Sequence, residues 1–290
     1  MVKTYKELYD YAYEPLAHLN MADLEARELV ALAARLCGAQ EDADSVRKKR
    51  SSNAPDAAYD TLTQLLEKRL SGMPLAYLLG EWDFYGITLR VTPAVLIPRS
   101  DTEDVVEYAI GEIEKRGAKR ILDLCCGSGC IGIAVLDSCE DTTVCFGDIE
   151  EDALAITREN VEYYKLQDRA EVRELDALDE PPADLGQFDM IITNPPYISS
   201  DEMAVLDVEV AAFEPSTALY GGYDGLNFYR TISAWWKDAV VPGGMIVAEC
   251  GAAQAHEVAQ LFEKNGWIEV EIGHDLAEHE RYVRAVRPVD

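Results

Sequence analysis

The later part of the chain alternates short apolar runs with amphipathic segments, and this alternation restricts the fold more than any other feature. Each of these runs is shorter than a typical helix. Short strands separated by helical segments are typical of a mostly parallel sheet with helices on both faces. The last two strands have no helical segment between them, so we expect them to pair antiparallel. The strands expected are 120–124, 143–146, 171–175, 188–193, 243–250, 267–272 and 281–286.

The first part of the chain has a helical pattern instead. Apolar residues recur at spacings of three or four over 4–18, 24–36 and 55–70. Apolar residues that flank Tyr85-Gly86 then suggest a β-hairpin. With 290 residues, the chain is long enough for one large domain and one small one. We therefore expect a helical domain at 1–80, a β-hairpin linker at 81–98 and an α/β domain at 99–290.

The net charge indicates which partners the chain can have. Lys and Arg number 26 and Asp and Glu number 54, so the formal charge is -28. Residues 81–290 hold 42 of the acidic residues and 16 of the basic ones. Such a surface repels phosphate backbones and attracts basic proteins. We therefore expect a protein partner and no direct binding to nucleic acid.

Cysteine usage and hydropathy indicate the compartment. The sequence has seven cysteines, no charged-then-apolar leader and no apolar run that is long enough to span a bilayer. These features predict a cytoplasmic protein with reduced thiols and no membrane association. Cys125, Cys126 and Cys130 cluster, but no His is close and no paired C-x-x-C occurs, so we expect no metal.

A glycine-rich loop at 127–132 follows the first strand of the α/β domain. Glycines let a ligand approach the backbone, and the helix that follows offers free N–H groups. Asp148 ends the next strand, about twenty residues on, where a carboxylate can accept hydrogen bonds from ribose hydroxyls. The G-x-G-x-x-G spacing also fits a dehydrogenase, which remains an alternative. Asp123 suits an ammonium group better than a pyrophosphate, so S-adenosyl-L-methionine fits both carboxylates.

The tetrapeptide Asn194-Pro195-Pro196-Tyr197 directly follows the strand expected at 188–193. Its prolines end the strand and hold Asn194 in extended geometry, at a sheet edge where ligands bind. The Asn194 side-chain oxygen and the Pro195 carbonyl can each accept one N–H of an amide or aromatic amine, while Tyr197 stacks on it. Catalysis would then come from orientation and electrostatic complementarity. The alternative is a strand followed by a Pro-Pro turn and a packing tyrosine.

Together these residues resemble the class I adenosylmethionine-dependent methyltransferases that act on a planar nitrogen. More specifically, the chain is similar to the bacterial release-factor glutamine methyltransferases (the PrmC/HemK family). The resemblance implies a seven-stranded, Rossmann-like α/β sheet with a small N-terminal helical bundle and a connecting β-hairpin. It also implies that the helical bundle docks the substrate and that 99–290 form the methyltransferase domain. The stretches that carry it are 74–81, 92–103, 121–129, Asp148, 194–197, 213–219 and 224–226.

The resemblance further implies the reaction and the site. The expected reaction methylates the N5 amide nitrogen of the glutamine in the Gly-Gly-Gln motif of peptide-chain release factors. It uses S-adenosyl-L-methionine and leaves S-adenosyl-L-homocysteine. The implied catalytic residues are Asn194, Pro195 and Tyr197, which bind the substrate together with Pro196. The implied cofactor residues are Asp123, Cys125, Cys126, Gly127, Ser128, Gly129, Asp148, Asp176, Ala177 and Asn194.

Several alternatives share part of this pattern. A glutamine methyltransferase of a ribosomal protein would use the same site on another substrate. An adenine-N6 methyltransferase would use the same tetrapeptide, but the acidity of the chain and its lack of a basic recognition domain disfavour DNA. A module that binds the cofactor without catalysis would keep the glycine loop but would not need Asn194 and Tyr197.

Overall fold

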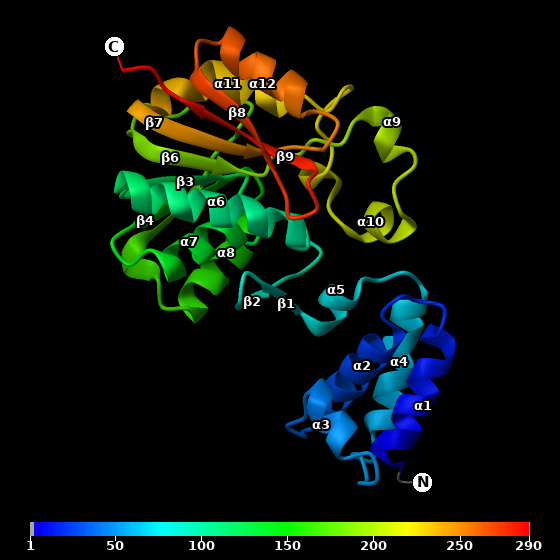
Figure 1. Cartoon of the computed structure of the whole chain (residues 1–290). Helices are drawn as coiled ribbons and strands as arrows, with labels where there is room; N and C mark the ends of the chain where they lie inside the picture. The colour runs from blue at the N-terminus through cyan, green and yellow to red at the C-terminus, as the bar shows by residue number, and fades with distance from the viewer. Residues whose placement is uncertain (1–2, 290) are drawn as a thin grey trace. The chain divides into compact units, whose positions relative to one another are not determined.

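The computed structural model describes residues 3–289, which fall into two compact units. The first unit contains the chain up to Gly80 together with Val208–Phe213. The second contains Glu81–Asp207 and the chain from Glu214 onward. The β-hairpin therefore lies in the second unit, whereas Val208–Phe213, which the sequence places in the range 99–290, lies in the first. Figure 1 labels the elements of both units.

The first unit is built from helices. A capping box starts the first of them, since the Thr4 hydroxyl accepts from the Glu7 N–H at 3.3 Å and the Glu7 carboxylate accepts from the Thr4 N–H at 2.8 Å. Fully buried side chains such as Leu8, Leu29 and Leu62 form its core. The elements are α1 (Tyr5–Leu16), α2 (Ala22–Leu36), α3 (Ala43–Lys48), α4 (Ala58–Leu70), α5 (Leu75–Leu79) and α10 (Val208–Phe213).

A buried ion pair links three helices of this unit. Arg69 on α4 donates from Nε to Glu25 on α2 at 2.6 Å and from Nη1 to Glu209 on α10 at 2.7 Å. The side chains of Arg69 and Glu25 are only 6% and 11% exposed. The guanidinium thus connects a segment late in the sequence to the helical unit.

The second unit is organised around one seven-stranded sheet in the order β5-β4-β3-β6-β7-β9-β8. The first five strands in this order are parallel, and β9 pairs antiparallel with both β7 and β8. The predicted α/β class and the antiparallel pairing of the last two strands are confirmed. The strands are β3 (Arg120–Leu124), β4 (Thr143–Asp148), β5 (Ala170–Glu174), β6 (Phe188–Thr193), β7 (Val240–Glu249), β8 (Ile268–His274) and β9 (Glu280–Val286).

Helices cover both faces of this sheet (Figure 1). Met190 and Ile192 of β6 belong to the core under α6, α7 and α8, whereas Ile191 belongs to the core under α11 and α12. Because both faces of β6 are buried, most of this strand is a continuous apolar run. The helices are α6 (Ser100–Arg116), α7 (Cys130–Ser138), α8 (Glu151–Tyr163), α11 (Asn227–Trp235), with the 3₁₀ turn η3 (Trp236–Ala239), and α12 (Ala255–Lys264).

The β-hairpin packs on the same unit. Its strands, β1 (Glu81–Phe84) and β2 (Ile87–Arg90), pair antiparallel, and Phe84 and Leu89 join the core under α6. The Arg90 N–H donates to Asn160 of α8 at 2.8 Å. The shorter elements are η1 (Gln167–Arg169), α9 (Ser200–Met203) and η2 (Ser216–Ala218). No helix within residues 3–289 combines the length and the apolar character that crossing a membrane requires.

Candidate active site

The carboxyl ends of β3 and β6 lie side by side where the strand order reverses. In the sheet, β4 and then β5 lie on one side of β3, whereas β6 and then β7 lie on its other side. Leu124 is paired with Gly147 of β4 and with Thr193 of β6. The loop after β3, Asp148 and Asn194 therefore meet at one edge of the sheet. Open α/β sheets bind their ligands at this kind of switch point.

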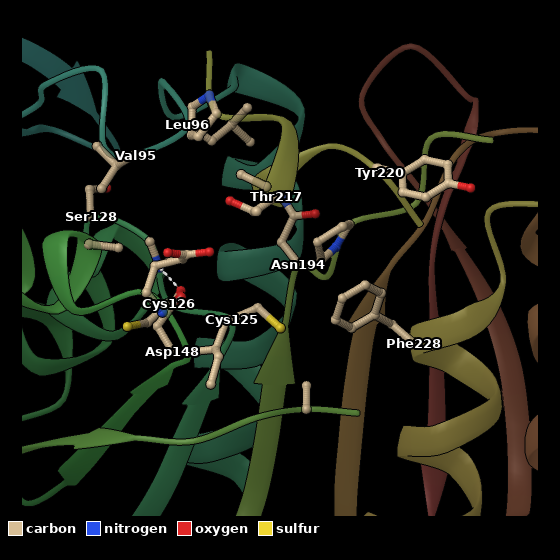
Figure 2. A pocket seen from close by; sticks show the side chains of 18 of the residues that line it. Val95, Leu96, Cys125, Cys126, Ser128, Asp148, Asn194, Thr217, Tyr220 and Phe228 are labelled. Carbon is tan, nitrogen blue, oxygen red and sulfur yellow. Dashed lines mark hydrogen bonds between the residues drawn. The ribbon is translucent and has the colours of Figure 1, made fainter. Parts of the chain in front are cut away.

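A cavity of about 540 Å³ occupies this edge (Figure 2). This is within the range of roughly 300–1,000 Å³ that is common for small-molecule sites. Of the residues that the sequence assigns to the site, Asp123, Gly129, Pro195 and Tyr197 do not line the cavity. Those that do line it are Cys125, Cys126, Gly127, Ser128, Asp148, Asp176, Ala177, Asn194 and Pro196.

The glycine loop is held in a conformation that few sequences can adopt. Cys125, Gly127 and Gly129 all have φ in the left-handed region, at 62°, 55° and 79°. At Cys125, which carries a side chain, such a backbone costs on the order of 1–3 kcal/mol. The neighbouring helix α8 holds the loop, since the Thr157 hydroxyl donates to the Gly127 carbonyl at 2.8 Å and Asn160 donates to the Ser128 carbonyl at 2.9 Å. The loop is thus fixed before any ligand binds.

Asp148 lies at the end of β4 and faces the loop across the cavity edge. Its Oδ2 accepts from the Gly127 N–H at 2.9 Å, and its Oδ1 accepts from the Glu150 N–H at 3.1 Å. Burial raises the pKa of Asp148, and these two backbone hydrogen bonds oppose the rise. A carboxylate oxygen can accept more than one hydrogen bond, so Asp148 keeps capacity for a ligand hydroxyl.

Asp123 lies in β3, behind the loop, and is completely buried. Its Oδ2 accepts from the Gly132 N–H at 2.9 Å, whereas Oδ1 has no hydrogen-bond partner in the described chain. Burial raises the pKa of Asp123 to about 7. The expected contact with a ligand ammonium group stays a prediction, because Asp123 is not part of the cavity wall.

The tetrapeptide divides between the cavity and the core. Asn194 and Pro196 line the cavity, and Asn194 Nδ2 donates to the Thr102 hydroxyl at 3.3 Å. Tyr197 packs, partly buried, against the core under α11 and α12, and its carbonyl accepts from Gln254 at 2.9 Å. Burial raises the pKa of the Tyr197 hydroxyl, so it stays protonated. The stacking role that the sequence predicts for Tyr197 therefore remains a prediction.

Comparison with known proteins decides the family. A family model described as the methyltransferase small domain matches residues 107–214. A release factor glutamine methyltransferase of Clostridium acetobutylicum is 38% identical over 77% of this chain and 78% of its own length. One of Chlamydia trachomatis is 39% identical over 75% of this chain and 73% of its own length. The chain belongs to the release factor glutamine methyltransferases.

The fold agrees with this membership. The hMettl16 catalytic domain, solved in complex with the MAT2A 3′UTR hairpin 6, gives a TM-score of 0.56 at 12% sequence identity. The match covers 81% of this chain and 82% of the other. At such low identity the likeness concerns the fold alone.

In this glutamine methyltransferase the cavity also has walls that sequence analysis missed. Figure 2 shows Val95 and Leu96 on the side of Ser128, and Tyr220 and Phe228 on the side of Asn194. The apolar Ile149 and Leu178 line it next to Asp148 and Ala177. Ile149 had a usable signal, since it directly follows Asp148, which was already assigned to the site. Val95 and Leu96 lie in the stretch 92–103 that carries the family resemblance, but that resemblance gave them no role in the site, and Phe228 had no signal because it comes from a distant segment.

An ion pair between a partly exposed arginine and a buried glutamate forms part of the cavity wall in this family member. Arg99, which lines the cavity, donates from Nη2 to Glu214 at 2.6 Å. Glu214 is only 6% exposed, and its other oxygen accepts from the Ile97 N–H at 3.4 Å. The pair fixes the segment before α6 to the segment before η2. Arg99 thus bridges to an acidic neighbour.

The cysteines around the loop are free thiols, as all seven cysteines of the chain are. Burial raises the pKa of Cys125 and of Cys126 well above the ordinary value, so both stay protonated. Among residues 3–289, no group of three or more His, Cys, Asp or Glu side chains is placed to hold a metal ion.

Proposed function

We propose that this chain transfers a methyl group from S-adenosyl-L-methionine to the N5 amide nitrogen of a glutamine in a peptide-chain release factor. The observation that carries the proposal is the position of Asn194 at the switch point. Its carboxamide lines the same cavity as the glycine loop and Asp148, and its Nδ2 is already used by Thr102. Its oxygen is therefore the atom available to an incoming N–H.

The residues present fit the cofactor. Asp148 can accept from the ribose hydroxyls, and a Cβ added at Gly127 would meet open space within the described chain. The unpartnered Oδ1 of Asp123 provides negative potential behind the loop that suits an ammonium and a sulfonium. Ile149, Leu178 and the small Ala177 provide an apolar wall for a flat base.

The chemistry needs orientation more than acid–base strength. An amide nitrogen is a poor nucleophile, because its lone pair is delocalised. When bound, S-adenosyl-L-methionine supplies an electrophilic methyl group on a sulfonium sulfur. Asn194 Oδ1 and the Pro195 carbonyl each accept one N–H of the substrate amide, and Tyr197 stacks on its plane. The amide nitrogen loses one of its two protons to solvent water as it gains the methyl group, so one of the two acceptors loses its hydrogen bond.

The charge of the chain supports a protein substrate. A net charge of -28 repels nucleic acid and does not repel a basic protein. Seven free cysteines suit a reducing compartment, so we place the reaction in the cytoplasm. The helical first unit offers a surface for docking a protein substrate, consistent with its lack of cavity-lining residues.

A methyl-incorporation assay tests the proposal. The enzyme is incubated with labelled S-adenosyl-L-methionine and, in separate reactions, with a release factor, the same factor carrying Gln→Glu in its Gly-Gly-Gln motif, ribosomal protein, and duplex DNA. We expect label in the intact release factor and none in the Gln→Glu factor, which lacks the acceptor nitrogen. Label in ribosomal protein or DNA and none in the release factor would overturn the proposal.

A further inference from the structure

A buried carboxyl group lies beside Asn194, and the chemistry proposed above does not use it. Glu249 is the last residue of β7 and is 1% exposed. Thr193 pairs with Ala248, so Asn194 and Glu249 are the next residues on adjacent parallel strands. One oxygen of Glu249, Oε2, has no hydrogen-bond partner within residues 3–289. Burying a carboxyl group is costly, so its position next to the reacting site calls for a physical role.

A side chain in the first turn of α6 connects the two residues. Thr102 is 2% exposed, and its hydroxyl accepts from Asn194 Nδ2 at 3.3 Å. Hydrogen bonding from Thr102 and from Asn194 also lowers the pKa of the Glu249 carboxyl. Thr102 also lines the cavity, so Nδ2 of Asn194 is bound by a hydroxyl of the cavity wall, and the strand register places the Glu249 carboxyl beside it. A carboxylate only accepts hydrogen bonds. If the Asn194 oxygen took the place of its NH₂ group, two acceptors would face each other with no hydrogen between them.

We propose that Glu249 and Thr102 are positioning residues that hold the Asn194 carboxamide with its oxygen directed at the substrate amide. The inference rests on the proposed function, because it specifies how that site is oriented. A flip of the carboxamide would place Oδ1 instead of the Nδ2 donor beside the Thr102 hydroxyl and would end the hydrogen bonding from Asn194 that lowers the pKa of Glu249. The flipped form would present the Asn194 NH₂ group to the substrate amide. The N–H groups of the substrate need an acceptor, and an amide NH₂ group is only a donor. Thr102 and Glu249 therefore favour the orientation of Asn194 in which its oxygen accepts hydrogen bonds from the substrate amide.

The protonation state of Glu249 gives this device a pH dependence. Burial raises the pKa of Glu249 to about 7, and the hydrogen bond from Thr102 and the charge of Arg281 oppose the rise. Above this pH the carboxylate accepts from Asn194 and Thr102; below it the carboxylic acid can donate instead, and the carboxamide is free to turn. Turnover should therefore fall as the pH drops through about 7. The titratable or charged groups that face Glu249 are Asp101 on α6, Cys130 on α7, Tyr197, Tyr229 on α11, Cys250 and Arg281 on β9.

These neighbours do not change charge in the same range. The pKa values of Cys130, Cys250, Tyr197 and Tyr229 are all raised by burial, so these groups stay neutral. Arg281 is held in its charged form and bonds to Asp101 at 3.1 Å. The thiols, the phenols and Arg281 thus keep their charge where the Glu249 carboxyl changes its own.

A matched pair of substitutions at Thr102 tests the inference. Thr102→Val keeps the shape but removes the hydroxyl, and Thr102→Ser keeps the hydroxyl. At saturating S-adenosyl-L-methionine and release factor, we expect Thr102→Val to lower kcat roughly ten- to a hundredfold, the scale of a misplaced catalytic group. Thr102→Ser should recover most of that loss. The affinity for S-adenosyl-L-homocysteine, measured by calorimetry, should change little in either variant.

The pH profile of Glu249→Gln provides the second readout, because a merely structural role would not move it. The wild-type kcat should fall on the acidic side of about pH 7, whereas Glu249→Gln should have a lower kcat that no longer falls there. If the wild type methylates the release factor but the two Thr102 variants have equal kcat, or if Glu249→Gln keeps the acidic limb, the inference is wrong. If the wild type itself gives no methylation, the proposed function is wrong. This result differs from a failure of the positioning inference, in which the wild type is active.

Discussion

Asp148→Asn is a sharp perturbation of the proposed cofactor site, because it replaces one oxygen and removes one charge without changing the shape. In the wild type, both carboxylate oxygens accept from backbone N–H groups, at 2.9 Å from Gly127 and 3.1 Å from Glu150. Asparagine has only one oxygen, so one of these N–H groups would face an NH₂ group. The substitution also removes a charged acceptor for the ribose hydroxyls. A hydrogen bond to a charged group contributes about 1.5–3 kcal/mol, which predicts roughly ten- to 150-fold weaker binding.

The assay is calorimetric titration with S-adenosyl-L-homocysteine, which needs no protein substrate. Asp152→Asn is the matched control, since Asp152 is an exposed residue of α8 and loses the same charge without touching the cavity. We expect Asp152→Asn to bind like the wild type and Asp148→Asn to bind more weakly. Equal affinity of all three proteins would refute the assignment of Asp148 to the ribose.

Three further outcomes follow from the structure. Asn194→Ala should lose about ten- to a thousandfold in kcat while keeping its affinity for S-adenosyl-L-homocysteine, because the contact matters mainly at the reacting geometry; an unchanged kcat would contradict this role. Asp123, with a pKa raised to about 7, is mostly protonated at pH 6 and ionised at pH 8. Calorimetry should therefore show tighter binding of the cationic S-adenosyl-L-methionine at pH 8, and Asp123→Asn should flatten this dependence; a pH-independent wild-type affinity would rule it out. Arg69→Met leaves the buried Glu25 without the guanidinium and should lower the stability of the helical unit by about 3–5 kcal/mol in thermal or urea unfolding, whereas Lys6→Met, at an exposed ion pair, should change little. A similar loss in both variants would show that the burial of Arg69 is not the cause.

The fold could be predicted because its signals are local. The central strands such as β6 are short apolar runs, and residues such as Met190 and Ile191 alternate between two cores without any change in polarity. The two prolines after Asn194 predict that the strand ends at Thr193, and β6 does end at this residue. The positions of Asn194, Asp148 and the glycine loop at one sheet edge then follow from the parallel order of the strands.

The remaining features depend on contacts between residues that are far apart in the sequence. Thr102 and Asn194 are 92 positions apart, and Arg69 and Glu209 are 140 positions apart. Nothing near Val208–Phe213 indicates that this segment groups with the helical unit. Glu249 reads as the ordinary end of an apolar strand, and only the register with β6 places it beside Asn194. Spacing along a single chain contains no information about such pairs.

The most direct test of the whole account locates the transferred methyl group. Release factor is incubated with the enzyme and methyl-labelled S-adenosyl-L-methionine, and the peptide that contains Gly-Gly-Gln is sequenced by tandem mass spectrometry. The account predicts one labelled methyl group on the side-chain amide of that glutamine with the wild type, and a strongly reduced amount with Asn194→Ala. A label on another residue, or equal labelling by the wild type and Asn194→Ala, would contradict the claim that the Asn194 carboxamide orients a planar amide for methylation.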